Sequence, residues 1–538
     1  MTDILKKIKE SKKKLFVGMA GPGTGKSYTF KTIIESNEFK GKKILILSFI
    51  NKLIDDLSED FKNFNNVKIL TLHAFAKQEL GDVDLDGELD DIVSKDYFLM
   101  KGANIKYAEK FYENNLNEDE KQFYTERKNF YKNKKELYSF NSIIYAINLF
   151  FSKYDDKIPT GYDLILIDEF QDFNKSEYEL IKLLNKKSVI VLVGDDNQSL
   201  YFFKKAYPKQ IRNLFADSDT ENFSLDYCYR CTEVIVDATN DLIRNVKKAG
   251  YLQESLIKKF LYPKDDEKHK NKHEISSKYN QIDFLPSISG DLLIYELAQN
   301  IKNSIKDGKK KRILIIVPGY LKQTIYDGLI GKGFNIIEFE LFWNEESNKV
   351  KHKNLIETFE TLTERKSDDL ALRKILFLYL DDEEIKKLLL EKKKIWLCLK
   401  SEIKETIELD IKIFKKVKKG KDALTHDELK RFSKVFNLKN ILSRIVKGFK
   451  PIMKNAIEIE MTTVMSSKGL SADFIYYVGI DDRNMLDKET NNFTDQKICE
   501  FLVGITRTKE KLTLISLKDK NPKILEFIDK KYINKIEK

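Results

Sequence analysis

Cysteine is scarce in this sequence, and long apolar runs are missing from it. The chain has four cysteines among 538 residues, which favours a reducing compartment over a fold stabilised by disulfides. No apolar run approaches the roughly 18 residues that a membrane-spanning helix needs. Residues 1–14 are polar and lysine-rich, without the apolar core of a secretory signal. We therefore expect a cytoplasmic protein with no membrane contact.

Residues that bind metals or carry redox chemistry are also few. The five histidines are scattered, and Cys398 and Cys499 are isolated. Cys228 and Cys231 form one Cys-x-x-Cys pair, but no second pair lies nearby. A lone pair is weak evidence for a metal or redox centre. We interpret these residues as reduced structural thiols.

Basic residues outnumber acidic ones in this chain. There are 96 Lys and Arg against 85 Asp and Glu, which gives a formal net charge of +11. The excess favours a polyanionic partner, although lysine-rich surfaces are often only solvated. The length of 538 residues is enough for about two to four domains with sizeable cores.

A phosphate-binding loop is the clearest feature near the start of the chain. An apolar run typical of a strand ends in a glycine-rich turn, and a helical pattern follows from Tyr28 to Ser36. Glycines let backbone N–H groups turn toward an anion, and the helix N-terminus adds its positive end. Lys26 would reach the β- and γ-phosphates of a nucleotide, and the Ser27 hydroxyl would hold Mg²⁺. The predicted ATP-binding loop comprises Ala20, Gly21, Pro22, Gly23, Thr24, Gly25, Lys26 and Ser27.

A pair of carboxylates follows a second predicted strand. The apolar run Leu164–Ile167 leads directly into Asp168 and Glu169. Asp-Glu pairs are common, but a pair at the end of a buried strand, downstream of a phosphate loop, is a strong signal. Asp168 would bind Mg²⁺, and Glu169 would orient and deprotonate the attacking water.

Two further polar residues are candidates for contact with the phosphates. Gln198 follows the predicted strand 188–193, where it could sense the γ-phosphate. The aromatic residues just beyond Gln198 could pass that signal on, or they could be ordinary core residues. Arg507 ends a predicted helix far from the phosphate loop and is a candidate arginine finger.

An αβ rhythm runs through both halves of the chain and predicts parallel sheets. Short apolar runs typical of buried parallel strands lie at 43–48, 67–71, 312–317, 335–340, 474–478 and 511–517, the last being the final strand expected. Residues 81–161 and 357–450 are instead charged and helical in period. The second of these is either a face toward nucleic acid or a solvated helical surface. The charge-dense segment Lys264–Lys278 predicts an exposed loop.

Taken in order, these motifs resemble those of the UvrD-like branch of superfamily 1 helicases, the UvrD/PcrA/Rep group. The similarity runs from Ala20 to Arg507, which is nearly the whole chain. Residues 20–27 resemble the Walker A motif of that family, and residues 168–172 resemble the sequence of its Walker B motif. Other segments similar to family motifs are 49–52, 71–75, 194–201, 229–230, 467–470 and 503–507.

The resemblance implies an α/β fold with two RecA-like P-loop motor domains, ATP between them and single-stranded DNA across the top. Each motor domain would carry one mainly helical insertion, and the second insertion is short. The implied boundaries are 1–80 and 158–215 for the first motor domain, 81–157 for its insertion, 216–357 and 453–538 for the second motor domain, and 358–452 for its insertion.

The resemblance also implies roles for single residues. Tyr229 would stack on the adenine of ATP, and Gly469 would also contact the nucleotide. Arg230 and Arg507 would reach the γ-phosphate from the second motor domain. The predicted catalytic set is therefore Lys26, Asp168, Glu169, Gln198, Arg230 and Arg507. Stacking on DNA bases contributes about 1–3 kcal/mol per base, and the predicted DNA contacts are Phe49, Asn51, His73, Tyr201, Phe203 and Ser467.

The implied activity is that of an ATP-driven translocase and helicase moving 3′→5′ on single-stranded and forked DNA, with ATP and Mg²⁺ as cofactors. Because the second insertion is short, we expect weak unwinding by a monomer and an improvement with a protein partner or a second copy. The same short insertion keeps open a nucleic-acid-gated regulatory ATPase of a larger assembly, with little or no unwinding. A non-motor P-loop GTPase is disfavoured, because the second half has its own αβ domain and arginines at motif positions.

The sequence departs from the family pattern at several positions. Residues 1–15 contain no glutamine, which the family usually places before Walker A to read adenine. Phe203 and Lys204 stand where the family favours Trp and Arg, which keeps a stacking face and a charge. Met465 and Ser471 replace a His and a Glu, so the expected contact of that Glu with the ribose is missing.

Overall fold

The computed structural model describes residues 2–48, 61–264, 270–304, 311–334, 336–338, 349–419, 424–425, 427–428, 431 and 459–537. The chain divides into two compact units. We call residues 1–72, 151–343 and 455–538 the sheet unit, and residues 73–150 and 344–454 the helical unit.

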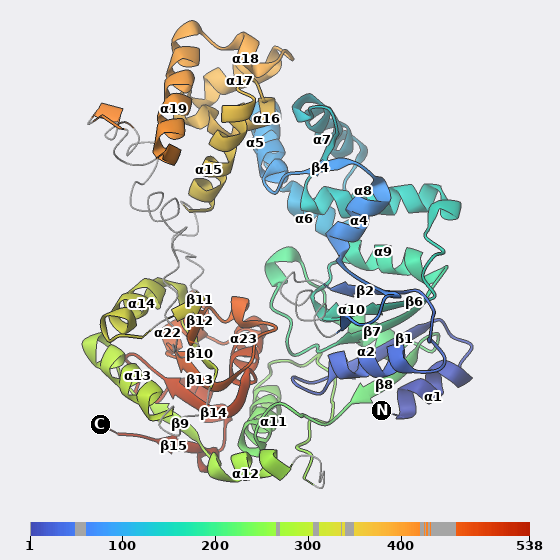
Figure 1. The fold of residues 1–538 in the computed structure, drawn as a ribbon, viewed down its shortest axis with the longest axis vertical. Helices are drawn as coiled ribbons and strands as arrows, with labels where there is room; N and C mark the ends of the chain where they lie inside the picture. Colours follow the sequence, from blue (N-terminus) through green and yellow to red (C-terminus); the bar gives the residue numbers. More distant parts are fainter. Residues whose placement is uncertain are drawn as a thin grey trace. The chain divides into compact units, whose positions relative to one another are not determined.

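Among the described residues, the sheet unit contains two parallel sheets (Figure 1), and the first of them has six strands. Its strand order is β3-β2-β6-β7-β1-β8, and every pairing is parallel. Strands β2 and β6 are buried along their whole length, as expected for a parallel sheet covered on both faces. The strands are β1 Leu15–Ala20, β2 Ile44–Ser48, β3 Val67–Thr71, β6 Leu164–Ile167, β7 Val189–Gly194 and β8 Glu221–Leu225.

Helices connect the strands of the first sheet. The helix α9 begins directly after the acidic segment 168–172, with a capping box formed by Asn174 and Glu177. Each of these two side chains accepts a hydrogen bond from the other residue's backbone N–H, so the helix start is fixed locally. The helices here are α1 Thr2–Glu10, α2 Lys26–Glu35, α9 Lys175–Asn185 and α10 Lys209–Ala216.

In the described part of the chain, the second sheet has seven strands in the order β11-β12-β10-β13-β14-β9-β15, again with parallel pairings throughout. Its strands are β9 Ile282–Leu285, β10 Ile313–Ile316, β11 Ile336–Glu338, β12 Ile459–Thr462, β13 Ala472–Val478, β14 Thr508–Ile515 and β15 Ile533–Lys535. Its helices are α11 Glu233–Lys248, α12 Lys270–Lys278, α13 Gly290–Ser304, α14 Lys322–Gly331, α22 Asp482–Met485 and α23 Asp495–Ile505. The predicted α/β class with parallel sheets is confirmed.

Strand β8 extends the first sheet past the predicted end of the first motor domain. It pairs with β1 in the first sheet, although it lies beyond residue 215. Helix α15, Lys349–Glu364, likewise crosses residue 358, where the second insertion was expected to start. We therefore propose that the first motor domain extends through Leu225 and that the insertions comprise residues 73–150 and 344–454.

Two local predictions are wrong. The segment 270–278 is the helix α12 rather than an exposed loop, because tertiary contacts hold it. The Ser276 hydroxyl accepts a hydrogen bond from the Glu233 N–H at 2.8 Å, and Lys272 Nζ donates to the Cys228 carbonyl at 2.9 Å. The strand Lys511–Leu517 is also not the last, because β15 follows it and pairs with β9.

The helical unit is built from both segments that interrupt the αβ rhythm. The first segment forms α4 Leu72–Leu80, α5 Leu89–Lys101, α6 Tyr107–Glu113, α7 Glu118–Tyr131 and α8 Phe140–Lys153, with β4 Val83–Leu85 paired in parallel with β5 Glu136–Tyr138. The second forms α15, α16 Asp369–Ile375, α17 Asp382–Leu390, α18 Ile395–Cys398 and α19 Ser401–Lys419. One hydrophobic core joins them, with Phe111 and Tyr124 from the first segment and Phe359 and Phe414 from the second. Among the described residues, no helix is both long and apolar enough to cross a membrane.

A buried carboxylate also ties the two segments together. The side chain of Asp96, on α5, is fully buried. It accepts hydrogen bonds from Arg127 Nε at 2.9 Å, from the Tyr131 hydroxyl and from Arg373 Nε at 2.8 Å. Arg373 lies on α16, in the other segment, and is 4% exposed. Because Asp96 is shielded from water, these donors replace its hydration shell.

Replacing Arg373 by methionine is expected to destabilise the helical unit by about 3 kcal/mol, because it leaves a buried carboxylate short of one cation. The chain has two tryptophans, Trp343 and Trp396. On a Trp343→Phe background, the fluorescence of Trp396 on α18 reports unfolding of this unit by urea. Arg365→Met is the matched control, because Arg365 is exposed and its ion pair with Asp368 should contribute less than about 1 kcal/mol. Equal losses in the two variants would contradict a structural role for Arg373.

Candidate nucleotide site

The predicted phosphate loop joins β1 to α2 and has the backbone that an anion cradle requires. Gly23 and Gly25 have positive φ angles of 68° and 86°, which favour glycine. The Thr24 hydroxyl donates to the Gly21 carbonyl at 2.9 Å and holds the turn. A Cβ on Gly23 would lie 2.4 Å from Cβ of Arg230, so this position admits no side chain. Helix α2 then starts at Lys26 with its N-terminus facing the loop.

The two predicted carboxylates meet the loop lysine at the end of β6. Lys26 Nζ lies 2.5 Å from Glu169 Oε1 and 3.6 Å from Asp168 Oδ1. Glu169 has a φ of 52°, an uncommon conformation for a residue with a side chain, and such conformations concentrate at functional sites. The prediction that Lys26, Asp168 and Glu169 share one site is therefore supported by their geometry.

Burial and charge act in opposite directions on these groups. Burial lowers the pKa of Lys26, but the charges of Glu169 and Asp168 outweigh it, and the pKa is raised. Burial alone would raise the pKa of Glu169, but Lys26 and Lys468 outweigh it and hold that pKa well below its usual range. Burial raises the pKa of Asp168. Glu169 is therefore ionised at neutral pH, as a general base must be.

Gln171 connects this acidic pair to the end of the neighbouring strand. Its Nε2 donates to Glu169 Oε2 at 2.6 Å, and its Oε1 accepts from the Asp195 N–H at 2.9 Å. Gln198 Nε2 in turn donates to Asp195 Oδ2 at 2.6 Å. The ends of β6 and β7 are thus joined through two glutamines and one aspartate.

Two basic residues from the side of the second sheet reach the same place. Arg507 Nη2 donates to Gln198 Oε1 at 2.8 Å, and Lys468 Nζ donates to the Gln198 carbonyl at 2.8 Å. Lys468 also forms an ion pair with Asp172 and lies 3.7 Å from Glu169 Oε2. Burial, assisted by Arg230, lowers the pKa of Arg507 to about 9, so it stays charged at neutral pH. Burial, only partly offset by Lys468, raises the pKa of Asp172 to about 6.

Tyr229 and Arg230 lie directly against the phosphate loop. The Tyr229 N–H donates to the Gly23 carbonyl at 2.8 Å, and the tyrosine is 39% exposed. Arg230 Nη1 donates to the Thr506 carbonyl at 3.4 Å. Tyr229 is thus next to the loop with an accessible ring, as expected of a residue that stacks on a base.

Comparison with known proteins agrees with this geometry. A family model described as an AAA domain matches residues 5–204. The chain is 28% identical over 420 residues to the ATP-dependent DNA helicase Rep of Buchnera aphidicola subsp. Schizaphis graminum, covering 65% of this chain and 61% of the relative. It is 23% identical over 644 aligned residues to the probable DNA helicase II homolog of Mycoplasma capricolum, covering 97% and 85%. An 82-residue stretch is 42% identical to DNA helicase II of Haemophilus influenzae, covering 15% and 11%.

The chain is similar to helicases of the UvrD/Rep-like group of superfamily 1. Its match spans 61% of the Buchnera Rep protein just described, which is less than two thirds of that relative.

The predicted DNA contacts are less completely described. Phe49 and Asn51 lie outside the described residues, and so does the side chain of Phe203. His73 packs edge-on against Phe140, with ring centroids 5.5 Å apart, in the helical unit. These positions stay predictions.

Tyr201 and Ser467 do lie close to the nucleotide site. Lys468 Nζ is 5.6 Å from the centroid of the Tyr201 ring, within reach of a cation–π contact. The Ser467 hydroxyl donates to the Val464 carbonyl at 2.7 Å. Gly469 follows Lys468 with a positive φ of 86°. Lys468 therefore contacts Glu169, Asp172 and an aromatic residue predicted to bind DNA.

Sequence reasoning missed several residues of the site, among them Asp172 and Asp195, which also stand inside recognised motifs. Gln171 and Lys468 stand inside motifs that were recognised, 168–172 and 467–470, so their place in those motifs was the available signal. Lys258, which pairs with Asp195 and Asp196, lies in no motif.

Proposed function

We propose that this UvrD/Rep-like chain is an ATP-dependent translocase and helicase on single-stranded DNA. One observation carries the proposal: Arg507 and Lys468, from the side of the second sheet, contact Gln198 and the carboxylates beside the phosphate loop of the first. Nucleotide bound at that loop would be contacted from both sheets. Hydrolysis would then alter the contact between the two motor domains, and a motor of this kind steps by such cycles of closure and opening.

The residues of the site are suited to ATP with Mg²⁺. The Asp168 carboxylate and the Ser27 hydroxyl are the oxygen ligands that Mg²⁺ prefers, and it completes its coordination with phosphates and water. Lys26 offsets part of the negative charge of the buried acidic pair, which indicates a place for positive charge. Mg²⁺ would neutralise charge on the phosphates. Lys26 would bind the β- and γ-phosphates, Glu169 would take a proton from the attacking water, and Arg230 and Arg507 would stabilise charge on the γ-phosphate.

The proposed substrate is single-stranded and forked DNA. Relatives are named ATP-dependent DNA helicase Rep and DNA helicase II, and the net charge of +11 suits a polyanion. We place Tyr201 and Phe203 on the DNA track, because Tyr201 is linked through Lys468 to the nucleotide site. The four cysteines are free, which suits work in the reducing cytoplasm.

The proposal is tested by ATP hydrolysis with and without single-stranded DNA, comparing ATP with GTP. We expect stimulation by DNA and a preference for ATP. Lys26→Ala should abolish hydrolysis and leave DNA binding largely intact, because the phosphate loop and the DNA track are separate surfaces. Full activity of Lys26→Ala would overturn the site assignment.

A single-turnover assay on forked duplexes then separates a helicase from a regulatory ATPase. We expect faster unwinding from a 3′ tail than from a 5′ tail, and stronger unwinding when a second copy or a partner loads on the same strand. Preference for the 5′ tail would overturn the polarity. DNA-stimulated hydrolysis without unwinding or translocation on any substrate would favour the regulatory ATPase.

A further inference from the structure

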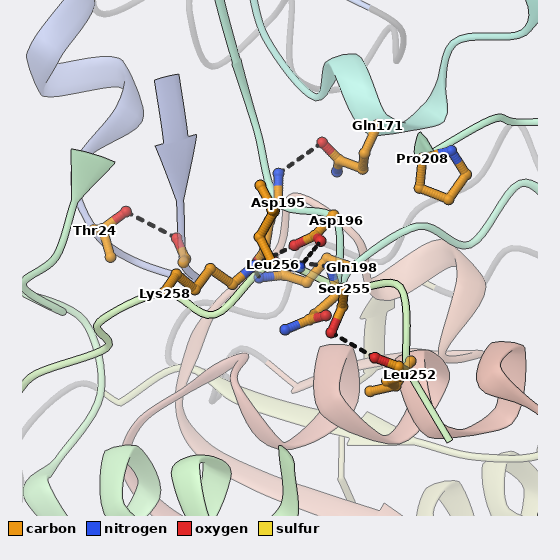
Figure 2. A network of polar contacts seen from close by, with 12 residues as sticks. Thr24, Gln171, Asp195, Asp196, Gln198, Pro208, Leu252, Ser255, Leu256 and Lys258 are labelled. Carbon is orange, nitrogen blue, oxygen red and sulfur yellow. Dashed lines mark hydrogen bonds and ion pairs between the residues drawn. The ribbon is translucent and has the colours of Figure 1, made fainter. Parts of the chain in front are cut away.

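A lysine that no motif contains lies inside the polar network of the nucleotide site (Figure 2). Lys258 belongs to the chain that follows α11, and its side chain is 9% exposed. Its Nζ donates to Asp196 Oδ1 at 2.8 Å and forms an ion pair with Asp195. The Leu256 N–H, two residues earlier, donates to Asp196 Oδ2 at 2.8 Å. The segment 256–258 is therefore attached to the end of β7 by one backbone and two side-chain contacts.

Asp195 connects this lysine to Gln198. The Asp195 carboxylate is buried, and its Oδ2 accepts a hydrogen bond from Gln198 Nε2 at 2.6 Å. Gln198 Oε1 accepts a hydrogen bond from Arg507 Nη2 at 2.8 Å. Lys258, Asp195, Gln198 and Arg507 thus form one continuous chain of contacts.

The orientation of the Gln198 amide follows from its two neighbours. An ionised carboxylate only accepts hydrogen bonds, and a guanidinium only donates them. The amide NH₂ must therefore face Asp195, and the amide oxygen must face Arg507. Burying a charged carboxylate is costly unless a cation pairs with it, so the position of the Asp195 carboxylate depends on its partners.

Lys258 pairs with one oxygen of the Asp195 carboxylate, Oδ1, and Gln198 donates to the other, Oδ2. Burial lowers the pKa of Lys258, but Asp195 and Asp196 outweigh it and raise that pKa, so the amine stays protonated. Arg212 Nε lies 3.8 Å from Asp196 Oδ2, so Asp196 has a second cation near it. Among the described residues, Lys258 is the cation in ion-pair contact with Asp195.

The same segment also touches the phosphate loop. Phe260 packs over Gly21, where a Cβ would lie 2.6 Å from Phe260 Cδ2. One short stretch therefore contacts the phosphate loop through Phe260 and the γ-phosphate sensor through Lys258 and Asp195.

We propose that Lys258 is a positioning residue, which through Asp195 orients the Gln198 amide so that its oxygen meets Arg507. The inference rests on the proposed ATPase function. Lys258 does not take part in the chemistry itself. It holds the amide oxygen of Gln198 toward Arg507. Its loss should therefore lower kcat and leave the affinity for nucleotide unchanged.

Steady-state kinetics of Lys258→Met test the proposal. We expect kcat to fall by about 10- to 100-fold, the usual size for a residue that orients a functional group, with KM little changed. Lys258→Arg keeps the charge and should recover most of kcat. Lys259→Met, at the exposed neighbouring position, is the matched control and should behave as wild type. A wild-type enzyme without ATPase activity would refute the proposed function, whereas an active wild type with an equally active Lys258→Met would refute only this inference.

A double variant separates positioning from general support of the fold. Lys258→Met added to Gln198→Ala should lower kcat little further, because the side chain that Lys258 positions is already gone. Additive losses would show that Lys258 acts elsewhere and would overturn the proposal.

The proposal would also be overturned if Lys258 contacted the nucleotide directly. A cavity of about 330 Å³ borders Gly21, Gln198 and Lys258, so a raised KM with unchanged kcat would mean that Lys258 binds nucleotide itself. If Lys258→Met does not fold, the kinetics of Asp195→Asn test the proposal instead, because this substitution keeps the shape of the side chain and removes its charge. It should lower kcat as Lys258→Met would, and wild-type turnover would refute the proposal.

Discussion

Replacing Arg507 by alanine is expected to slow ATP turnover by about 10³-fold or more, the usual scale for an arginine finger, while ATP binding changes little. Arg507 is 3% exposed and bonds to Gln198 from the side of the second sheet. In that position its charge would stabilise the γ-phosphoryl group only as negative charge develops there. Interactions that strengthen in the transition state act on kcat rather than on binding.

Single-turnover hydrolysis and equilibrium binding of a fluorescent ATP analogue together check this expectation. Arg507→Lys should also be slow, because an ammonium lacks the planar fork of donors. Arg483→Ala, an exposed arginine on α22 that stacks on Tyr320, is the control and should be neutral. A loss confined to nucleotide affinity would argue against a role in the transition state.

Glu169→Gln should still bind ATP with Mg²⁺ and turn over more slowly by about 10²–10⁴-fold, the range expected when a general base is lost. The amide keeps the shape of the side chain but cannot accept a proton from water. It also removes the charge that holds Lys26 at 2.5 Å, so binding of the phosphates by Lys26 should not weaken.

The measurement pairs steady-state turnover with ATP binding in the same buffer. Glu179→Gln is the control, because Glu179 lies on α9 and pairs with Lys182 away from the loop. Turnover near that of wild type would show that Glu169 is not the base and that another group activates the water.

Much of the fold could be predicted from local pattern. Strands β3 and β6 have the bounds that the apolar runs 67–71 and 164–167 predict. A continuous apolar run of this length, between polar ends, is buried on both faces and has few alternatives to a parallel strand. Edge strand β8, with alternating exposed and buried residues, and the charged helix α12 lacked such a signal.

The acidic pair and the phosphate loop could also be predicted from the sequence, for a topological reason. Lys26 follows β1, and Asp168 and Glu169 follow β6, so these residues leave their strands at the same edge of one parallel sheet. Parallel strands place their carboxyl ends together, and ligands of such sheets bind there. The prediction of a shared site needed only the order of motifs and strands.

The sequence by itself determined the phosphate loop, the acidic pair, the parallel strands and the two interrupting helical segments, because each is a local pattern of residues. Only the tertiary structure decided which charges meet. Arg507 bonds to Gln198 from 309 residues away, and Arg373 reaches Asp96 across 277 residues. Lys258 pairs with Asp195, which lies 63 residues earlier in the chain, and no motif contains Lys258. Lysines, arginines and carboxylates are abundant in this chain, and only burial in a common place makes one pairing favourable over the others.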